Sequence, residues 1–170
     1  MQESKGTLIE FFVGDHHHCD GEWAAFEAAC DGVNSDNNGR EKARAHWNSF
    51  ARATLLHLHL EEEVAFPEFE ARTGMTGGPT AMMRMEHERM RALISQIDEA
   101  VRLEEWDDAL DHGDTLLLLT QQHNQKEEAI LYPMLGESIG DDWPMIFRRV
   151  EEKMELFKES DSTGSDADAQ

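Results

Sequence analysis

The sequence is poor in cysteine and proline: its 170 residues include 2 cysteines and 4 prolines. Two thiols cannot build a cysteine-based zinc site or a disulfide framework. Cys19 and Cys30 fall on one predicted helix and lie about 16 Å apart along its axis, which is beyond the reach of a disulfide. We therefore expect a protein of a reducing compartment, the cytoplasm.

The sequence also lacks positive charge and long apolar runs. It has 15 Lys and Arg against 36 Asp and Glu, a formal charge of −21. A surface this negative repels phosphate backbones and anionic headgroups, so we expect no nucleic-acid partner and no membrane. No run approaches the roughly 20 apolar residues of a membrane span, and no leader opens the chain. These absences predict a soluble, unexported protein.

Helical periodicity extends over nearly all of the chain, and turn-forming residues cluster at a few points only. The predicted helices are four long segments, 7–31, 40–72, 80–104 and 107–135, and a short accessory helix, 142–158. Such a pattern predicts an all-α fold, an up-down-up-down four-helix bundle with a short additional C-terminal helix. We expect one bundle domain over residues 1–158, with its core at 7–135, and a disordered acidic tail at 159–170.

Nine histidines accompany the acidic residues, and some of them fall in an internal repeat. The segments 57–67 and 123–133 both read H-x-x-x-E-E-x-x-x-aromatic-P, at an offset of 66 residues. A His and a Glu four residues apart share one helix face, so each segment offers two ligands to one metal centre. A helix requires neither the His nor the Pro, so the repeat indicates a function rather than a folding requirement.

The other two long helices carry acid–His pairs near their beginnings, Asp15-His16 and Glu86-His87. In an antiparallel bundle these early positions lie level with the late positions of the repeat, so six side chains can meet in one layer. They are four imidazoles and two carboxylates: His16, His57, His87, His123, Glu61 and Glu127. Six nitrogen and oxygen donors are too many for one tetrahedral zinc and suit iron or manganese. The repeat predicts two metals, one held by His16 and His57 and the other by His87 and His123, with both Glu side chains bridging.

These residues resemble the hemerythrin-like HHE cation-binding domains over residues 7–135. The resemblance is carried by the pattern H…HxxxE…H…HxxxE, by Asp-His-x-x-Cys-Asp from Asp15 and by Glu-Glu-x-x-x-Phe-Pro from Glu61. It implies a non-haem di-iron centre inside a four-helix bundle, with two Fe ions bridged by carboxylates and an oxo or hydroxo group; manganese is the alternative metal. The implied iron ligands are His16, His57, Glu61, His87, His123 and Glu127.

One departure from the oxygen-carrying hemerythrins concerns their fifth histidine. Those proteins have an H-x-x-x-H pair on the third helix, whereas Met83 and Arg91 stand four residues before and after His87. The four-His, two-Glu set is similar to iron-centre repair proteins of nitrosative and oxidative stress and to mycobacterial hemerythrin-like proteins associated with peroxide breakdown.

The resemblance leads us to expect a stress-defence protein that binds or turns over peroxide, O₂ or nitric oxide. Its electron donor is unknown. The alternative is an O₂- or iron-binding sensor, storage or iron-donor protein without turnover. The sequence therefore leaves open whether the chain is a peroxide- or nitric-oxide-consuming oxidoreductase, and whether it is a monomer or a homodimer.

Other histidines compete with the six ligand candidates. His17 and His18 adjoin His16, but only one of the three can share the core-facing stripe, and the Asp-His position is the one that the family uses. His59 and Glu63 also form an i,i+4 pair, which lacks a counterpart in the second repeat, so we interpret it as surface. For His46 and His112, about 16 Å down the helix axes, we favour buried, hydrogen-bonded side chains.

The sequence allows two interpretations for each of two residues near the predicted site. Cys19, one turn after His16, either borders the site or is a packed thiol. Tyr132 either hydrogen-bonds near the metals or only packs. We expect the outer neighbours of the ligands among four acidic residues, Asp15, Asp20, Glu62 and Glu128.

Overall fold

The computed structural model describes residues 6–164, with side chains as far as Ser160, and this part of the chain contains helices and no strand. The helices are α1 Leu8–Cys30, α2 Asn37–Leu60, the π-helical η1 Glu61–Ala65, α3 Phe66–Thr73, α4 Pro79–Leu103, α5 Trp106–Lys126, the π-helical η2 Glu127–Leu131, α6 Tyr132–Ile139, the 3₁₀-helical η3 Gly140–Asp142 and α7 Trp143–Gly164. The predicted all-α class is confirmed.

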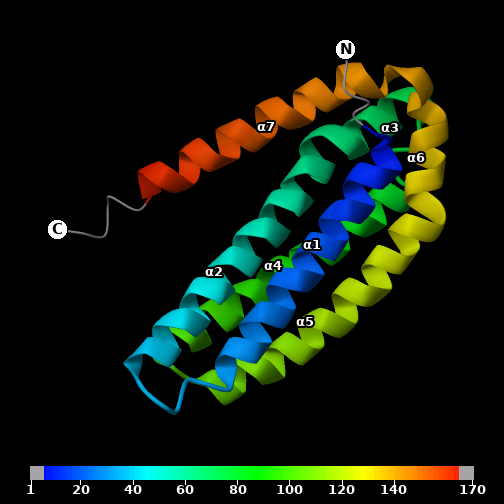
Figure 1. Cartoon of the computed structure of the whole chain (residues 1–170). Helices are drawn as coiled ribbons and strands as arrows, with labels where there is room; N and C mark the ends of the chain where they lie inside the picture. Colours follow the sequence, from blue (N-terminus) through cyan, green and yellow to red (C-terminus); the bar gives the residue numbers. More distant parts are fainter. Residues whose placement is uncertain (1–5, 165–170) are drawn as a thin grey trace.

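The long helices form an up-down-up-down bundle, in which α1 packs against α2 and α4 packs against α5 (Figure 1). The turns after α1 and α4 lie at one end of the bundle, and α3 and α6 extend α2 and α5 toward the other end (Figure 1). Side chains fix two helix beginnings. Thr7 and Glu10 form a capping box at α1, and the Asp36 carboxylate accepts from the Gly39 N–H at 2.8 Å, so α2 begins three residues before the predicted position 40.

We predicted that the two helices of the repeat are continuous α-helices. In the structure each of them is interrupted by a π-helical turn. The N–H of Phe66 bonds the carbonyl of Glu61, and the N–H of Tyr132 bonds the carbonyl of Glu127. In an α-helix residues five apart lie about 140° round the axis, whereas the wider π turn brings them toward one face. Each ring therefore faces the same interior as its Glu. A Pro follows each ring and, lacking an N–H, cannot restore the α-helical bond at that position.

Two apolar clusters fill the bundle, one at each end. The cluster near the α1–α2 turn contains Trp23, Phe26, Trp47, Phe50 and their neighbours. The cluster at the other end contains Phe12, Phe66, Phe69, Tyr132 and the beginning of α7. Full burial of one such side chain contributes about 1.5–3 kcal/mol, so these clusters supply the stability that offsets a layer of buried polar groups between them.

The accessory helix is longer than predicted. It begins near the predicted position 142, as α7, and continues to Gly164. Trp143, Ile146 and Val150 are buried against the end of the bundle. The helix then continues past α2, where Phe157 lies against His59, and its C-terminal end diverges from the bundle (Figure 1). Residues 159–164 of the expected disordered tail are thus helical, and residues 165–170 lie outside the described part of the chain. No helix within residues 6–164 is both long and apolar enough to cross a membrane.

Candidate metal centre

The structure brings the six predicted ligands together in the polar layer between the two apolar clusters. All are buried, with exposed fractions from 0% to 4%: His16, His57, Glu61, His87, His123 and Glu127. The imidazoles lie in the predicted pairs. The His16 and His57 ring centroids are 4.8 Å apart, as are those of His87 and His123. We call the first pair half A and the second pair half B.

Glu61, at the beginning of η1, faces one imidazole of each half. Its Oε2 lies 3.4 Å from Nε2 of His57 and 3.3 Å from Nε2 of His87. Helix geometry explains the first contact, since His57 and Glu61 are one turn apart, and bundle packing supplies the second. Glu61 therefore lies between the halves, where a bridging ligand would have to be.

Glu127 takes the equivalent position in the second repeat. Its Oε2 lies 3.2 Å from Nε2 of His16, and its Oε1 lies 3.0 Å from Nε2 of His123. The carboxylate again contacts one imidazole of each half, through different oxygens. The two carboxylates related by the internal repeat thus lie between the two halves, and each contacts both of them.

The outer nitrogen of every imidazole in the layer faces a carboxylate. The Nδ1 contacts are His16 with Glu128 at 2.7 Å, His57 with Asp15 at 3.3 Å, His87 with Glu62 at 2.7 Å and His123 with Glu86 at 2.9 Å. An Nδ1–H that donates to a carboxylate leaves the Nε2 lone pair directed inward. This is the arrangement in which outer carboxylates orient metal-binding histidines.

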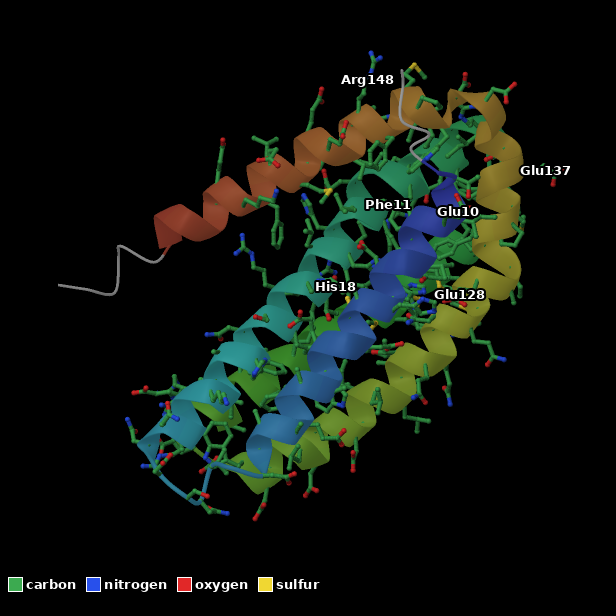
Figure 2. The ribbon with its side chains drawn as sticks, viewed as in Figure 1. Glu10, Phe11, His18, Glu128, Glu137 and Arg148 are labelled. Carbon is green, nitrogen blue, oxygen red and sulfur yellow. The ribbon has the colours of Figure 1, made fainter. Side chains whose placement is uncertain are left out.

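Three of the four expected outer neighbours hold such a position, and Asp20 does not, because it is exposed. Glu128 lies at the edge of the bundle beside α1 (Figure 2). Sequence reasoning missed Glu86 as an outer neighbour. The signal was available, because Glu86-His87 matches Asp15-His16, and each of these acids holds a histidine of the neighbouring helix.

These contacts shift several pKa values. Burial lowers the pKa of His87, but the nearby carboxylates of Glu61 and Glu62 outweigh burial and raise that pKa to about 9. Burial raises the pKa of Glu62, but hydrogen bonds with His87 and Arg91 lower it to about 2. The neighbouring His123 and His16 likewise hold the pKa of Glu127 below its usual range, against the effect of burial. The metal-free centre therefore retains protons on imidazole, and metal binding has to displace them.

The centre also contains buried polar atoms without a hydrogen-bond partner among the described residues. They are Nε2 of His57, Oε2 of Glu61 and Oε1 of Glu127. Buried polar atoms are almost always satisfied, so a group of orphans calls for an explanation such as an ion. Neighbouring donor atoms around an octahedral ion with bonds of about 2.1 Å lie about 3 Å apart, close to the spacings observed between these side chains. The residues fit a metal.

Two groups of side chains could hold an ion, since their donor atoms lie within 4.8 Å of one another. One group is Glu61, His87, His123 and Glu127; the other is His16, His57 and Glu127. Glu127 belongs to both groups. The arrangement thus offers two adjacent ion positions that share a carboxylate.

The residues at the fifth-histidine positions have other roles. Met83 is buried in the apolar cluster. Arg91 holds Glu62 with a fork of two hydrogen bonds, Nη2 to Oε2 at 2.7 Å and Nη1 to Oε1 at 3.0 Å. Arg91 therefore holds in place the outer carboxylate that contacts His87 of half B.

The competing histidines lie outside the layer. His17 and His18 are exposed on α1. The ring of His59 lies against Phe157 of α7, with centroids 5.5 Å apart, and is half-buried rather than on the open surface. We predicted that His46 and His112 are buried, but both are half-buried, because they lie near the bundle surface rather than on the core stripe.

Tyr132 is fully buried and contacts the centre directly. Its hydroxyl oxygen lies 2.7 Å from Glu61 Oε1, 3.0 Å from Glu127 Oε2 and 3.0 Å from His16 Nε2. Burial and the two carboxylates raise the pKa of Tyr132 well above 10, so in the metal-free protein the phenol keeps its proton. Of the two interpretations of Tyr132, hydrogen bonding at the site is the one that the structure shows.

A small cavity of about 20 Å³ adjoins half A. His16 and His57 line it together with mainly apolar neighbours, among them Trp23, Phe50, Met90 and Leu116. Cys19 also lines this cavity, so it does border the site. Burial raises the pKa of the Cys19 thiol to about 12, so in the metal-free protein this side chain of the cavity wall is uncharged.

A four-helix bundle whose facing helices direct His and Glu side chains into a common layer is the architecture of carboxylate-rich metal proteins. The hemerythrin HHE cation-binding domain model matches residues 7–135, and the chain belongs to this family. No curated protein and no solved structure matches the chain significantly. Family membership and the buried His/Glu groups together indicate metal binding, for which iron is the common ion of the family.

Proposed function

We propose that the chain is a non-haem di-iron protein that binds or turns over a small oxidant: peroxide, O₂ or nitric oxide. One observation carries the proposal. Glu61 and Glu127 each face one imidazole of each half, so both carboxylates lie where ligands that bridge two ions would be. Half A and half B would each supply two imidazoles. Nitrogen and oxygen donors suit iron, with manganese as the alternative.

The chain's own residues prepare this centre in three ways. The four outer carboxylates fix the imidazoles with Nε2 inward, so little reorganisation is needed when metal binds. The apolar clusters above and below limit water in the layer. When bound, two adjacent irons would supply one-electron changes in pairs and a coordination position for a small ligand.

The cavity beside half A supports a substrate of a few atoms. Its volume of about 20 Å³ is enough for roughly one water-sized molecule and too small for an organic substrate. Besides His57 Nε2, three buried polar atoms of its lining residues have no hydrogen-bond partner among the described residues: Trp23 Nε1, Thr54 Oγ1 and Thr120 Oγ1. They can bond to a small polar guest such as peroxide.

Metal analysis of the purified protein tests the proposal. After growth with iron we expect two irons per chain, and a loss of iron in the His57→Ala, His123→Ala double variant. His59→Ala, which changes a histidine outside the layer, is the matched control and should keep both irons. Absence of metal in the wild type, or unchanged iron in the double variant, would contradict the proposal.

Turnover is tested separately by adding peroxide or nitric oxide to the reduced, iron-loaded protein and following product release. Continuous product formation supports an oxidoreductase. A stable adduct without product supports the alternative, a sensor, store or iron donor.

A further inference from the structure

The hydroxyl of Tyr132 has more acceptors around it than one proton can serve. Glu61 Oε1 and Glu127 Oε2 belong to carboxylates and only accept hydrogen bonds. The Nε2 of His16 is the third polar neighbour of the hydroxyl, at 3.0 Å. A single phenolic proton thus faces two carboxylate oxygens, at 2.7 and 3.0 Å, in a fully buried place. A cation among these four atoms would remove the mismatch.

The same distances are those of neighbouring ligands on one ion. Donor atoms at right angles around an ion with bonds of about 2.1 Å lie about 3 Å apart. The Tyr132 oxygen keeps this spacing to three atoms that half A and the bridging carboxylates would present to one metal. We propose that Tyr132 is a seventh metal-binding side chain, which binds the iron of half A through its phenolate oxygen.

Backbone geometry explains how the ring reaches this position. The π turn η2 brings Tyr132 onto the face of Glu127, five residues earlier. The Tyr132 ring then stacks on His16, with centroids 5.5 Å apart and planes at 26°. Tyr132 does not line the cavity beside half A, so phenolate binding leaves the cavity side of this half free.

Half B also has an aromatic ring stacked on a histidine, but that ring carries no hydroxyl group. Phe66, the counterpart of Tyr132 in the repeat, stacks on His87 with the same centroid distance of 5.5 Å and the same angle of 26°. Stacking therefore requires an aromatic ring in both halves, but only half A receives a phenol. The hydroxyl is the part of Tyr132 that packing does not explain.

The inference rests on the proposed function, because it needs iron in half A. On binding, the phenol O–H bond breaks, the oxygen bonds the ion and the proton leaves to water, with no change of oxidation state. The ion's charge reverses the local field that otherwise keeps the phenol protonated. Tyrosinate is an established iron ligand in proteins, and as a hard anionic oxygen it favours ferric over ferrous iron.

The test uses the fact that Tyr132 is the sole tyrosine of the chain. The wild-type protein is grown with ring-deuterated tyrosine, loaded with iron, oxidised in air and examined by visible absorption and resonance Raman spectroscopy. We expect a phenolate-to-iron(III) charge-transfer band, and ring vibrations enhanced by that band that shift on deuteration. Because the label marks one residue, no variant is needed to assign the signal.

Two variants complete the experiment. Tyr132→Phe should lose the charge-transfer band and keep two irons. Phe66→Leu, which removes the counterpart ring, should keep the band and two irons. Two bound irons without labelled phenolate vibrations in the wild type would overturn this inference and leave the di-iron proposal standing. A wild type without iron would overturn both.

Discussion

The two halves of the candidate metal centre each contain two buried imidazoles and contact the same two carboxylates, but their surroundings differ. In half B both outer carboxylates are neutralised, Glu62 by Arg91 and Glu86 by Lys126. In half A no Lys or Arg of the described chain pairs with Asp15 or Glu128. Half A instead has the cavity and the phenol of Tyr132, and half B has Phe66.

This difference shows how a repeated motif can divide its tasks. The repeat reproduces what ion binding needs: a His, a Glu four residues later, and an outer carboxylate. Around this shared set, charge neutralisation makes half B the better-shielded position, while the cavity gives half A access to a small molecule. Under the proposed di-iron function, half A would be the half that a small molecule reaches through the cavity.

The largest expected effect comes from Glu127, which belongs to both halves. Glu127→Ala should reduce iron from two per chain to near zero, because both ion groups lose a carboxylate. Metal analysis of the purified variant measures this. Glu137→Ala, which changes an exposed glutamate of α6, is the control and should keep both irons (Figure 2). A Glu127→Ala protein that retains one firmly bound iron would show that the halves bind independently.

A second prediction concerns the pH dependence of the metal-free protein. His87 has a folded-state pKa of about 9 against an ordinary value of 6.5. The stabilisation from its protonated form is therefore fully present below pH 6.5 and is lost as pH rises through 9, about 3 kcal/mol in all. Urea unfolding of the metal-free protein between pH 6 and pH 10 should show this decline. The iron-loaded protein should lack this decline, since its His87 carries no inward proton, and His87→Gln should flatten it in the metal-free protein.

Replacement of the outer carboxylates should weaken metal binding by about 10–100-fold, the usual cost of losing such a partner. We expect the larger loss for Glu62→Gln, whose contact with His87 is 2.7 Å, and the smaller for Asp15→Asn, whose contact with His57 is 3.3 Å. Calorimetric titration with Mn²⁺ compares the two. Equal losses of Mn²⁺ affinity in the two variants would show that the outer carboxylates support both halves equally.

The smallest expected effect is that of Lys126→Met. Without the cation, Glu86 would resemble the unneutralised acids of half A, and the extra negative charge should strengthen ion binding in half B. The gain should stay under about 1 kcal/mol because Lys126 is 37% exposed and water screens the charge. The same Mn²⁺ titration measures it, and weaker binding would reverse the assigned role of Lys126.

Local signals in the sequence were sufficient for the four ligand candidates of the repeat, whereas His16 and His87 were chosen from their helix positions and from the family resemblance. His57 and Glu61 share a face by helix geometry alone, and the offset of 66 residues points to His123 and Glu127. The pairing of outer acids was harder. Asp15 supports His57 on the next helix rather than a residue of its own helix, which depends on how the helices are rotated in the bundle.

The π turns and the end of α7 were beyond the sequence reasoning for a different reason. A π turn differs from an α turn by a single shifted backbone bond, and the following Pro67 and Pro133 are its only local signs. The role of Tyr132 depends on this shift, since five residues in an α-helix would place its ring away from Glu127. Residues 159–164 have a composition typical of tails, yet they continue an amphipathic helix that begins on the bundle.

Mössbauer spectroscopy of the protein loaded with ⁵⁷Fe tests the central claim most directly, because it reports on the number, coupling and equivalence of the irons. We predict two ferric ions per chain that are magnetically coupled through their shared bridges, with two unequal quadrupole doublets from the unlike surroundings of half A and half B. Isolated, uncoupled ferric iron, or one ion per chain, would contradict the account.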